Sequence, residues 1–251
     1  METPPSYIDT DDGHRIAYRH VAGVEPGILF CSGFHSNMQG DKALALEAWC
    51  RDSGRQFTRF DYFGHGESSG DAAQGRIGRW AEDTQRILDT VCRGPQVIVG
   101  SSMGGWMMLL TALARPGRVV GLVGIASAPD FSRAMKARLE ELGAWAEIEA
   151  QGHYDMPSHY PGESTYRIEK GFVEEAEQHC LLDAPIALNL PVRLLHGQAD
   201  ADVPCQRSML LAQALASDDV EITLVKDGDH RLSRPRDLAL LRRVLGALLP
   251  D

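Results

Sequence analysis

The sequence predicts an α/β fold in which a mostly parallel, twisted sheet carries helices on both faces. From residue 27 onward, short β-type runs alternate with longer helical runs. Several strand candidates, such as Val97-Ile98-Val99, are apolar without alternation, which is typical of strands buried on both faces. One connection, residues 130–190, far exceeds the ~2–6 residues usual in such units and must have structure of its own.

The N-terminal segment predicts an antiparallel ribbon at one edge of this sheet. Residues 7–10 and 15–21 flank Asp11-Asp12-Gly13, a hairpin signal. The candidates for the remaining strands follow at 27–31, 56–60, 96–100, 119–126, 192–197 and 220–225.

Helices are predicted where apolar residues recur at steps of three and four. One such stripe runs through residues 80–91 and another through 238–248, and both are expected to pack on the sheet. A further helical run, 106–114, directly follows the strand candidate 96–100.

The long connection is expected to be a helical cap inserted over one end of the sheet. Its portion 133–149 is rich in Ala, Leu and Glu, and 168–182 is again helix-like. A stretch containing Pro, Tyr and His, 152–162, lies between them. We therefore expect one domain over residues 1–251 with a cap at about 130–190.

Composition and charge exclude several classes of partner. The 251 residues are 43% apolar and 24% charged, which is ordinary for a globular protein. A net charge of -10 repels phosphate backbones and anionic lipid headgroups, so nucleic acid and membrane-surface partners are disfavoured. No run approaches the ~20 apolar residues of a membrane span, and residues 1–12 lack the basic flank of an export signal. A soluble, cytoplasmic protein is expected, of undetermined oligomeric state.

The cysteines and histidines do not predict a metal site. The five cysteines are an odd number and none lies within four residues of another, so free thiols are expected. The nine histidines offer no H-x-x-x-H pair. We expect neither a catalytic metal nor a cofactor.

The sharpest chemical signal is Gly100-Ser101-Ser102-Met103-Gly104, which fits G-x-S-x-G between a strand and a helix. In that context the serine lies on a tight turn with its hydroxyl above the sheet, and the glycines leave room for the turn. Ser102 is therefore the predicted nucleophile. A serine hydroxyl is a weak nucleophile at neutral pH, so it requires a base, and the base requires an orienting acid.

Three aspartates are candidates for the acid. Asp200 is preferred because it follows the strand 192–197, at the sheet edge where sites on open α/β sheets form. Asp202 is the alternative, although its place beside Val203-Pro204 suits a helix entry. Asp130, after the preceding strand, is a third and weaker candidate.

His230 is the predicted base, because it follows the last strand and is the only histidine downstream of Asp200. The oxyanion would be held by two backbone N–H groups. One is expected from Met103, the residue after the nucleophile, and the other from the loop after strand 27–31. Phe34 is preferred there, with Gly33 and His35 as alternatives.

With these residues placed, the chain resembles the α/β-hydrolase superfamily along nearly its whole length. The turn Asp61-Tyr62-Phe63-Gly64-His65-Gly66-Glu67-Ser68 is similar to that superfamily's D-x-x-G-x-G-x-S turn. The resemblance implies a sheet with an inserted cap, and Ser102, Asp200 and His230 as the nucleophile, acid and base.

The sequence around the nucleophile turn and several motifs elsewhere resemble one branch of that superfamily, mitochondrial palmitoyl-protein thioesterases that also cleave acyl glucuronides. The motifs are Gly100–Trp106, Met156-Pro157-Ser158, Glu175-Ala176, His179–Leu182, Pro185-Ile186 and Pro191–Gly197. Within that branch the N-terminus is Arg-rich, whereas here it is acidic and short.

The function predicted from these observations is hydrolysis of an acyl thioester or ester through an acyl-enzyme, with S-depalmitoylation or acyl glucuronide cleavage as possible forms. Partners would be small acyl compounds or an acylated protein. Candidate walls of an acyl pocket are Phe34, Met103, Trp106, Trp145, Met156 and Tyr160, of which Trp106, Met156 and Tyr160 are the predicted substrate-binding residues. A C–C bond hydrolase or haloperoxidase-like enzyme is the alternative, and a non-catalytic binding protein is a third.

Overall fold

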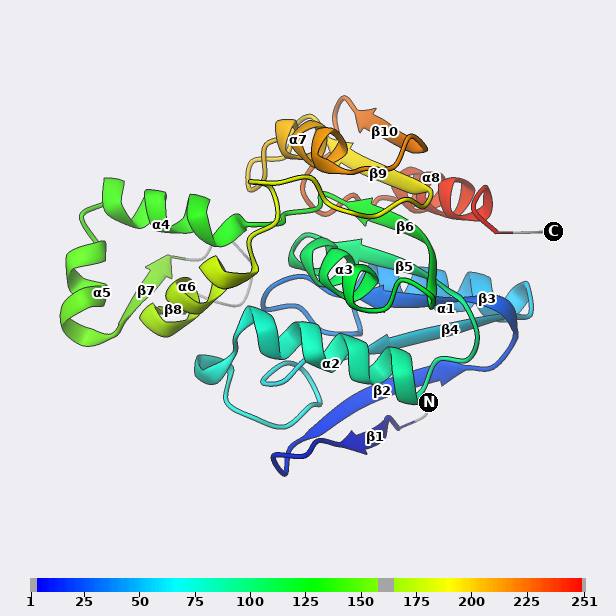
Figure 1. Ribbon diagram of the computed structural model, residues 1–251, viewed down its shortest axis with the longest axis horizontal. Coiled ribbons are helices and arrows are strands. Elements are labelled where there is room, and N and C mark those ends of the chain that lie inside the picture. Colours follow the sequence, from blue (N-terminus) through cyan, green and yellow to red (C-terminus); the bar gives the residue numbers. More distant parts are fainter. Residues whose placement is uncertain (1–3, 158–164, 250–251) are drawn as a thin grey trace.

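The computed structural model describes residues 4–157 and 165–249. An eight-stranded sheet runs through the centre in the order β1-β2-β4-β3-β5-β6-β9-β10 (Figure 1). The mostly parallel α/β architecture predicted from the sequence is confirmed.

The expected antiparallel ribbon forms one edge of the sheet. Strand β1 (Ser6–Asp9) pairs antiparallel with β2 (Arg15–Val21), and β2 pairs antiparallel with β4. All other neighbours in the sheet pair in parallel. These strands are β3 (Val24–Cys31), β4 (Arg55–Phe60), β5 (Gln96–Ser101), β6 (Val119–Ile125), β9 (Val192–Gly197) and β10 (Val220–Val225).

Helices cover both faces because successive residues of a buried strand point to opposite sides. In β3, Ile28 and Phe30 pack with α1 (Asp41–Asp52) and α8 (Pro235–Gly246) on one face. Leu29 and Cys31 pack on the other face in the cluster that contains α2 (Ile77–Thr90) and α3 (Met103–Ala114). Helix α7 (Gln206–Ala214) contacts β9 and β10. Two apolar cores therefore hold the sheet from both sides.

The chain between β6 and β9 forms the inserted cap, which stands beyond one end of the sheet, at the left of Figure 1. Its described elements are α4 (Phe131–Glu141), α5 (Trp145–Gln151), β7 (His153–Pro157), β8 (Thr165–Glu169), α6 (Lys170–Ala176) and the 3₁₀ turn η2 (Glu177–His179). A second 3₁₀ turn, η1 (Ala72–Gln74), precedes α2.

The internal structure of the cap differs from the expected run of helices. Residues 133–149 form two helices rather than one, because Gly143 takes a left-handed conformation (φ +69°) between α4 and α5. The segment between the two expected helical portions was not expected to contain strands, yet β7 and β8 form an antiparallel two-stranded sheet, and β8 takes in the first two residues of the run 168–182. Tyr166 and Ile168, two apart, point to the buried side of β8, so the local period is that of a strand.

Two carboxylates hold the cap in place. Asp130, at the start of the insertion, accepts hydrogen bonds from the amides of Leu181 and Leu182 near its end, at 2.8–3.1 Å. Glu175 on α6 accepts the amides of Ile77 and Gly78, both at 2.9 Å, at the N-terminus of α2. The first contact joins the two ends of the cap to each other, and the second ties the cap to α2 of the sheet domain.

Within the described residues, no helix is long and apolar enough to cross a bilayer.

Candidate active site

Ser102 occupies a strained turn between β5 and α3. Its backbone has φ 54° and ψ -120°, a region that residues with a side chain rarely adopt. The turn is also crowded, because a Cβ on Gly100 would lie 2.4 Å from the carbonyl oxygen of Gly104, and one on Gly104 would lie 2.0 Å from that of Cys31. Only glycine fits at both positions, so the G-x-S-x-G spacing follows from the packing of the turn.

Three side chains predicted from the sequence lie in a hydrogen-bonded line at the carboxyl ends of the strands. The Oγ of Ser102 is 3.1 Å from Nε2 of His230, and Nδ1 of His230 is 2.8 Å from Oδ2 of Asp200. The Asp200 side chain is fully buried, whereas His230 retains 15% of its exposure. The arrangement suits transfer of a proton from the serine to the histidine.

Asp200 is held ionised by its surroundings. Its Oδ1 accepts the amides of Asp202 and Val203, at 2.9 and 2.8 Å. Burial alone would raise the pKa of Asp200, but hydrogen bonds from His196, His230 and the Val203 amide outweigh this cost and hold its pKa far below the ordinary value. The carboxylate therefore keeps its negative charge beside the imidazole of His230.

The other two candidate acids have different surroundings. Asp202 is exposed, and its backbone N–H donates to Asp200. It does not begin the next helix as expected, since α7 begins at Gln206, beyond Pro204. Asp130 is buried, and its carboxylate accepts hydrogen bonds from the backbone amides of Leu181 and Leu182. We expect a structural role for Asp130.

Asp200, Asp202 and His230 are the group of described residues whose ligand atoms come close enough to hold a metal ion. These atoms lie within 4.8 Å of one another. Asp200 and His230 are already hydrogen-bonded to each other, and Asp202 is exposed. The hydrogen bonds of the line from Ser102 to Asp200, and that from the Asp202 amide to Asp200, explain why these three residues lie close together.

The predicted oxyanion donors flank Ser102. Met103 is the first residue of α3, so its N–H has no carbonyl acceptor within the helix. Phe34 lies in the loop after β3, where a Cβ on the neighbouring Gly33 would be 3.4 Å from the Cβ of Ser102. The loop therefore runs close beside the serine. His35 in the same loop has a left-handed backbone, with φ 53°.

An aromatic cluster fills the space between the oxyanion loop and the cap. The ring of Phe34 stacks on Phe172 of α6 at 5.4 Å and lies 5.6 Å from Phe131 and 5.9 Å from Trp80. Tyr166 of β8 approaches the same loop, 5.7 Å from His35. The sequence reasoning did not single out Phe131, Tyr166 or Phe172, because their proximity to Phe34 depends on how the cap docks.

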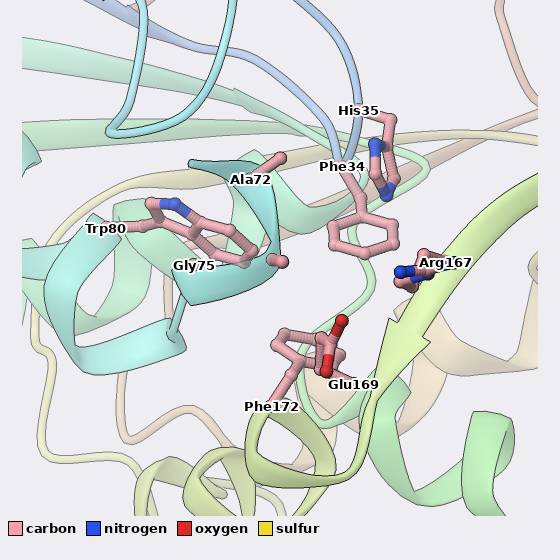
Figure 2. A pocket seen from close by; sticks show the side chains of 9 residues that line it. Phe34, His35, Ala72, Gly75, Trp80, Arg167, Glu169 and Phe172 are labelled. Atoms are coloured by element: carbon pink, nitrogen blue, oxygen red, sulfur yellow. The ribbon is translucent and has the colours of Figure 1, made fainter. Parts of the chain in front are cut away.

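A small cavity opens beside this cluster (Figure 2). Phe34, Trp80 and Phe172 form its apolar walls, and Arg167 and Glu169 reach it from β8. Its volume is about 20 Å³, enough for about one water molecule. Ser102 and His230 do not line it. The cap and the oxyanion loop are thus packed closely together in this structure.

The predicted substrate-binding residues lie in three different situations. Trp106 is fully buried in α3, and its indole N–H donates to the carbonyl of His179 at 3.0 Å, so it supports the cap from below. Met156 lies on β7 opposite Tyr166 and packs against the apolar core. Tyr160 falls outside the described residues. A substrate role for these residues stays a prediction.

The arrangement of sheet, cap and strained serine defines an α/β hydrolase. The model of the alpha/beta hydrolase family matches residues 28–240, and the chain belongs to this family. The predicted fold class and the prediction of a hydrolase are confirmed by this membership.

Individual relatives are similar over most of the chain. Mouse "Palmitoyl-protein thioesterase ABHD10, mitochondrial" is 45% identical over 94% of this chain and 79% of its own length. The human protein of that name is 42% identical over 96% of this chain and 78% of its own. The structure of mouse alpha/beta hydrolase domain-containing protein 10 superposes with a TM-score of 0.91 at 43% identity, covering 98% of both chains.

The relatives correct one expectation. A cytoplasmic location was expected because residues 1–12 are polar and acidic. The mouse and human relatives are named as mitochondrial proteins, so this expectation is wrong. Charge in a short segment is a weaker guide to location than similarity over more than 90% of the chain.

Proposed function

We propose that the chain is a serine hydrolase that cleaves acyl thioesters and esters, with Ser102 as nucleophile, His230 as general base and Asp200 as the orienting acid. The observation that carries the proposal is the line from Ser102 Oγ through the His230 ring to the buried Asp200 carboxylate, at 3.1 and 2.8 Å. Nothing in the chemistry of this line requires a cofactor.

The reaction follows from the placement of these groups. His230 takes the proton of the Ser102 hydroxyl as the oxygen attacks the acyl carbonyl carbon. The amides of Met103 and Phe34 receive the oxyanion, and each such donor contributes ~3 kcal/mol to its stabilisation. His230 then protonates the departing thiol or alcohol, and water attacks the acyl-enzyme by the same route. Asp200 stabilises the imidazolium in both halves because it stays ionised.

The substrate class is proposed from the relatives and from the apolar surroundings of the oxyanion loop. Relatives that are 42–45% identical are named palmitoyl-protein thioesterases, which act on a long-chain acyl thioester. The aromatic cluster around Phe34 makes the side of the oxyanion loop that faces the cap apolar. An S-acylated protein, a small acyl thioester and an acyl glucuronide are therefore the proposed substrates.

Reaction with a fluorophosphonate probe tests the nucleophile directly. The wild-type protein should be labelled, because an activated serine attacks the phosphorus atom, and Ser102→Ala should not be labelled. Ser101→Ala, one residue away on β5, is the matched control and should retain labelling. A wild-type protein that resists the probe would contradict the proposal.

A chain-length series of thioesters beside the corresponding oxygen esters tests the substrate class. The kcat/KM for thioesters should rise with acyl length up to about C16, because each buried CH₂ contributes about 0.8 kcal/mol. An acyl glucuronide in the same assay compares a third leaving group, the glucuronide, with the thiol and the alcohol. Absence of turnover with all three classes would favour a C–C bond hydrolase or haloperoxidase-like activity.

A further inference from the structure

A second, buried histidine contacts the same oxygen of Asp200 as His230 does. His196 lies in β9, four residues before Asp200, and its side chain is fully buried. Its Nε2 is 3.3 Å from Oδ2 of Asp200 and 2.9 Å from the carbonyl oxygen of Val203. Its Nδ1 is 2.7 Å from Oγ of Ser208 on α7. None of the steps of hydrolysis described above uses this ring.

The partners of the His196 ring determine where its proton lies. Both neighbours of Nε2 are hydrogen-bond acceptors, so Nε2 carries the hydrogen. Nδ1 of a neutral ring is then an acceptor, which the Ser208 hydroxyl satisfies as donor. Ser208 is 1% exposed, so its hydroxyl needs this partner. A neutral ring also adds no second charge to the interior.

The result is a chain of polar contacts that extends the catalytic line. Ser208 donates to Nδ1 of His196, and the Nε2–H of His196 donates to the Val203 carbonyl while lying 3.3 Å from Oδ2 of Asp200, the atom that receives the Nδ1–H of His230. The two loop amides fix only Oδ1 of Asp200. At Oδ2 the carboxylate contacts both imidazole rings, His230 at 2.8 Å and His196 at 3.3 Å, so His196 packs against the oxygen that binds the catalytic histidine.

We propose that His196 is a positioning residue for the Asp200 carboxylate, and that Ser208 fixes the tautomer that allows it. This inference rests on the proposed function, since it assigns His196 a role in the reaction of Ser102. It also accounts for a histidine as the second-to-last residue of β9, a buried parallel strand in which an apolar residue would be expected.

The experiment compares His196→Leu with His196→Gln in hydrolysis of a short p-nitrophenyl ester. Leucine fills the space without a donor, and kcat should fall about 10- to 100-fold with KM within twofold, as expected for loss of an N–H dipole beside a charged group and of its bond to the adjoining loop. Glutamine places an amide N–H near the position of Nε2 and should restore kcat to within about fivefold of wild type.

A matched control and a second variant keep the test decisive. His20→Leu makes the same change at a half-buried histidine on β2, whose Nδ1 is also bonded to a hydroxyl, that of Thr58, and kcat should be unchanged. Should His196→Leu fail to fold, Ser208→Ala leaves the histidine in place and should lower kcat about threefold to tenfold.

The outcomes separate this inference from the proposed function. Wild-type protein without ester turnover would refute the proposed function itself. An active wild type with His196→Leu or Ser208→Ala at full kcat would refute only the positioning role. Equal losses in His196→Leu and His196→Gln would also refute it, because the N–H donor would then be irrelevant.

Discussion

The three candidates for the catalytic acid, Asp200, Asp202 and Asp130, differ in the groups that their carboxylates bind. In the structure only the Asp200 carboxylate receives the Nδ1–H of His230. Asp200→Asn should therefore lower kcat about 10³- to 10⁴-fold, because an amide in that position favours the wrong imidazole tautomer. Steady-state hydrolysis of a p-nitrophenyl ester measures the loss.

The variants Asp202→Asn and Asp130→Asn are the controls for this change. Asp202→Asn should retain kcat within about threefold, since its backbone amide, which contacts Asp200, is unaltered. Asp130→Asn should lower thermal stability more than kcat, because the Asp130 carboxylate binds the end of the cap. Near-normal turnover in Asp200→Asn would exclude it as the acid.

Asp83 makes the stability of the fold depend on pH. It is 5% exposed in α2, and its Oδ2 accepts the amide of Phe63 at 2.8 Å. Burial raises the pKa of Asp83 to about 7, against an ordinary value of 3.8. The folded state thus binds a proton that the unfolded state releases. Stability from this group is present below pH 4 and is lost as the pH rises through about 7.

Asp83→Asn should remove this dependence, because the amide keeps an acceptor for Phe63 and does not ionise. Between pH 5 and pH 8, the wild type should lose about 2 to 3 kcal/mol of unfolding free energy relative to the variant. Urea denaturation of both proteins at the two pH values provides the comparison. A constant difference across this range would show that Asp83 does not titrate between them.

At the scale of elements, Glu175 provides the polar contact between α6 of the cap and α2 of the core. Glu175 binds two free amides at the N-terminus of α2, and His179 Nε2 lies 2.7 Å from the same carboxylate. The N-cap residue of α2, Arg76, forms no side-chain cap of its own. Glu175 therefore acts as the N-terminal cap of a helix distant in sequence.

Glu175→Ala should cost about 1 to 2 kcal/mol of unfolding free energy and loosen the cap. Limited proteolysis should then cut within 130–190 faster than in wild type. The neighbouring Glu174→Ala is the control, since Glu174 is exposed and lies 3.5 Å from Lys170 in a surface ion pair worth little. Equal cleavage rates in the two variants would argue against docking through Glu175.

At the scale of the whole molecule, the cap and the sheet share one apolar core. The cluster that contains Trp106 and Met107 of α3 also contains Phe172 and Val173 of the cap. We propose that the chain is one domain in which the cap has no independent stability. In urea, tryptophan fluorescence and far-UV circular dichroism should then change in a single coincident transition.

Trp145 provides the control for that measurement, because it is the tryptophan of the cap, whereas Trp49, Trp80 and Trp106 lie on α1, α2 and α3. Trp145→Phe should leave the midpoint of the fluorescence transition aligned with that of the dichroism. Two separated transitions, the first lost in Trp145→Phe, would show that the cap unfolds by itself.

The sequence was sufficient to predict every strand of the main sheet. It was also sufficient to select the three residues that the structure brings together in the proposed catalytic line. Periodicity and turn chemistry act within a few residues, so β5, the turn at Ser102 and α3 can all be predicted locally. Chain order and loop position then favoured Asp200 over Asp202, and the structure places Asp200 at 2.8 Å from His230.

The cap and the surroundings of the site were decided by tertiary structure. The pairing of β7 with β8 and the stacking of Phe34 on Phe172 join residues whose contacts depend on how the insertion docks. The role of His196 likewise depends on Ser208 twelve residues later and on the burial of both side chains. A local pattern in sequence reports propensity, whereas these contacts result from packing between distant segments and from desolvation, which exist only in the folded chain.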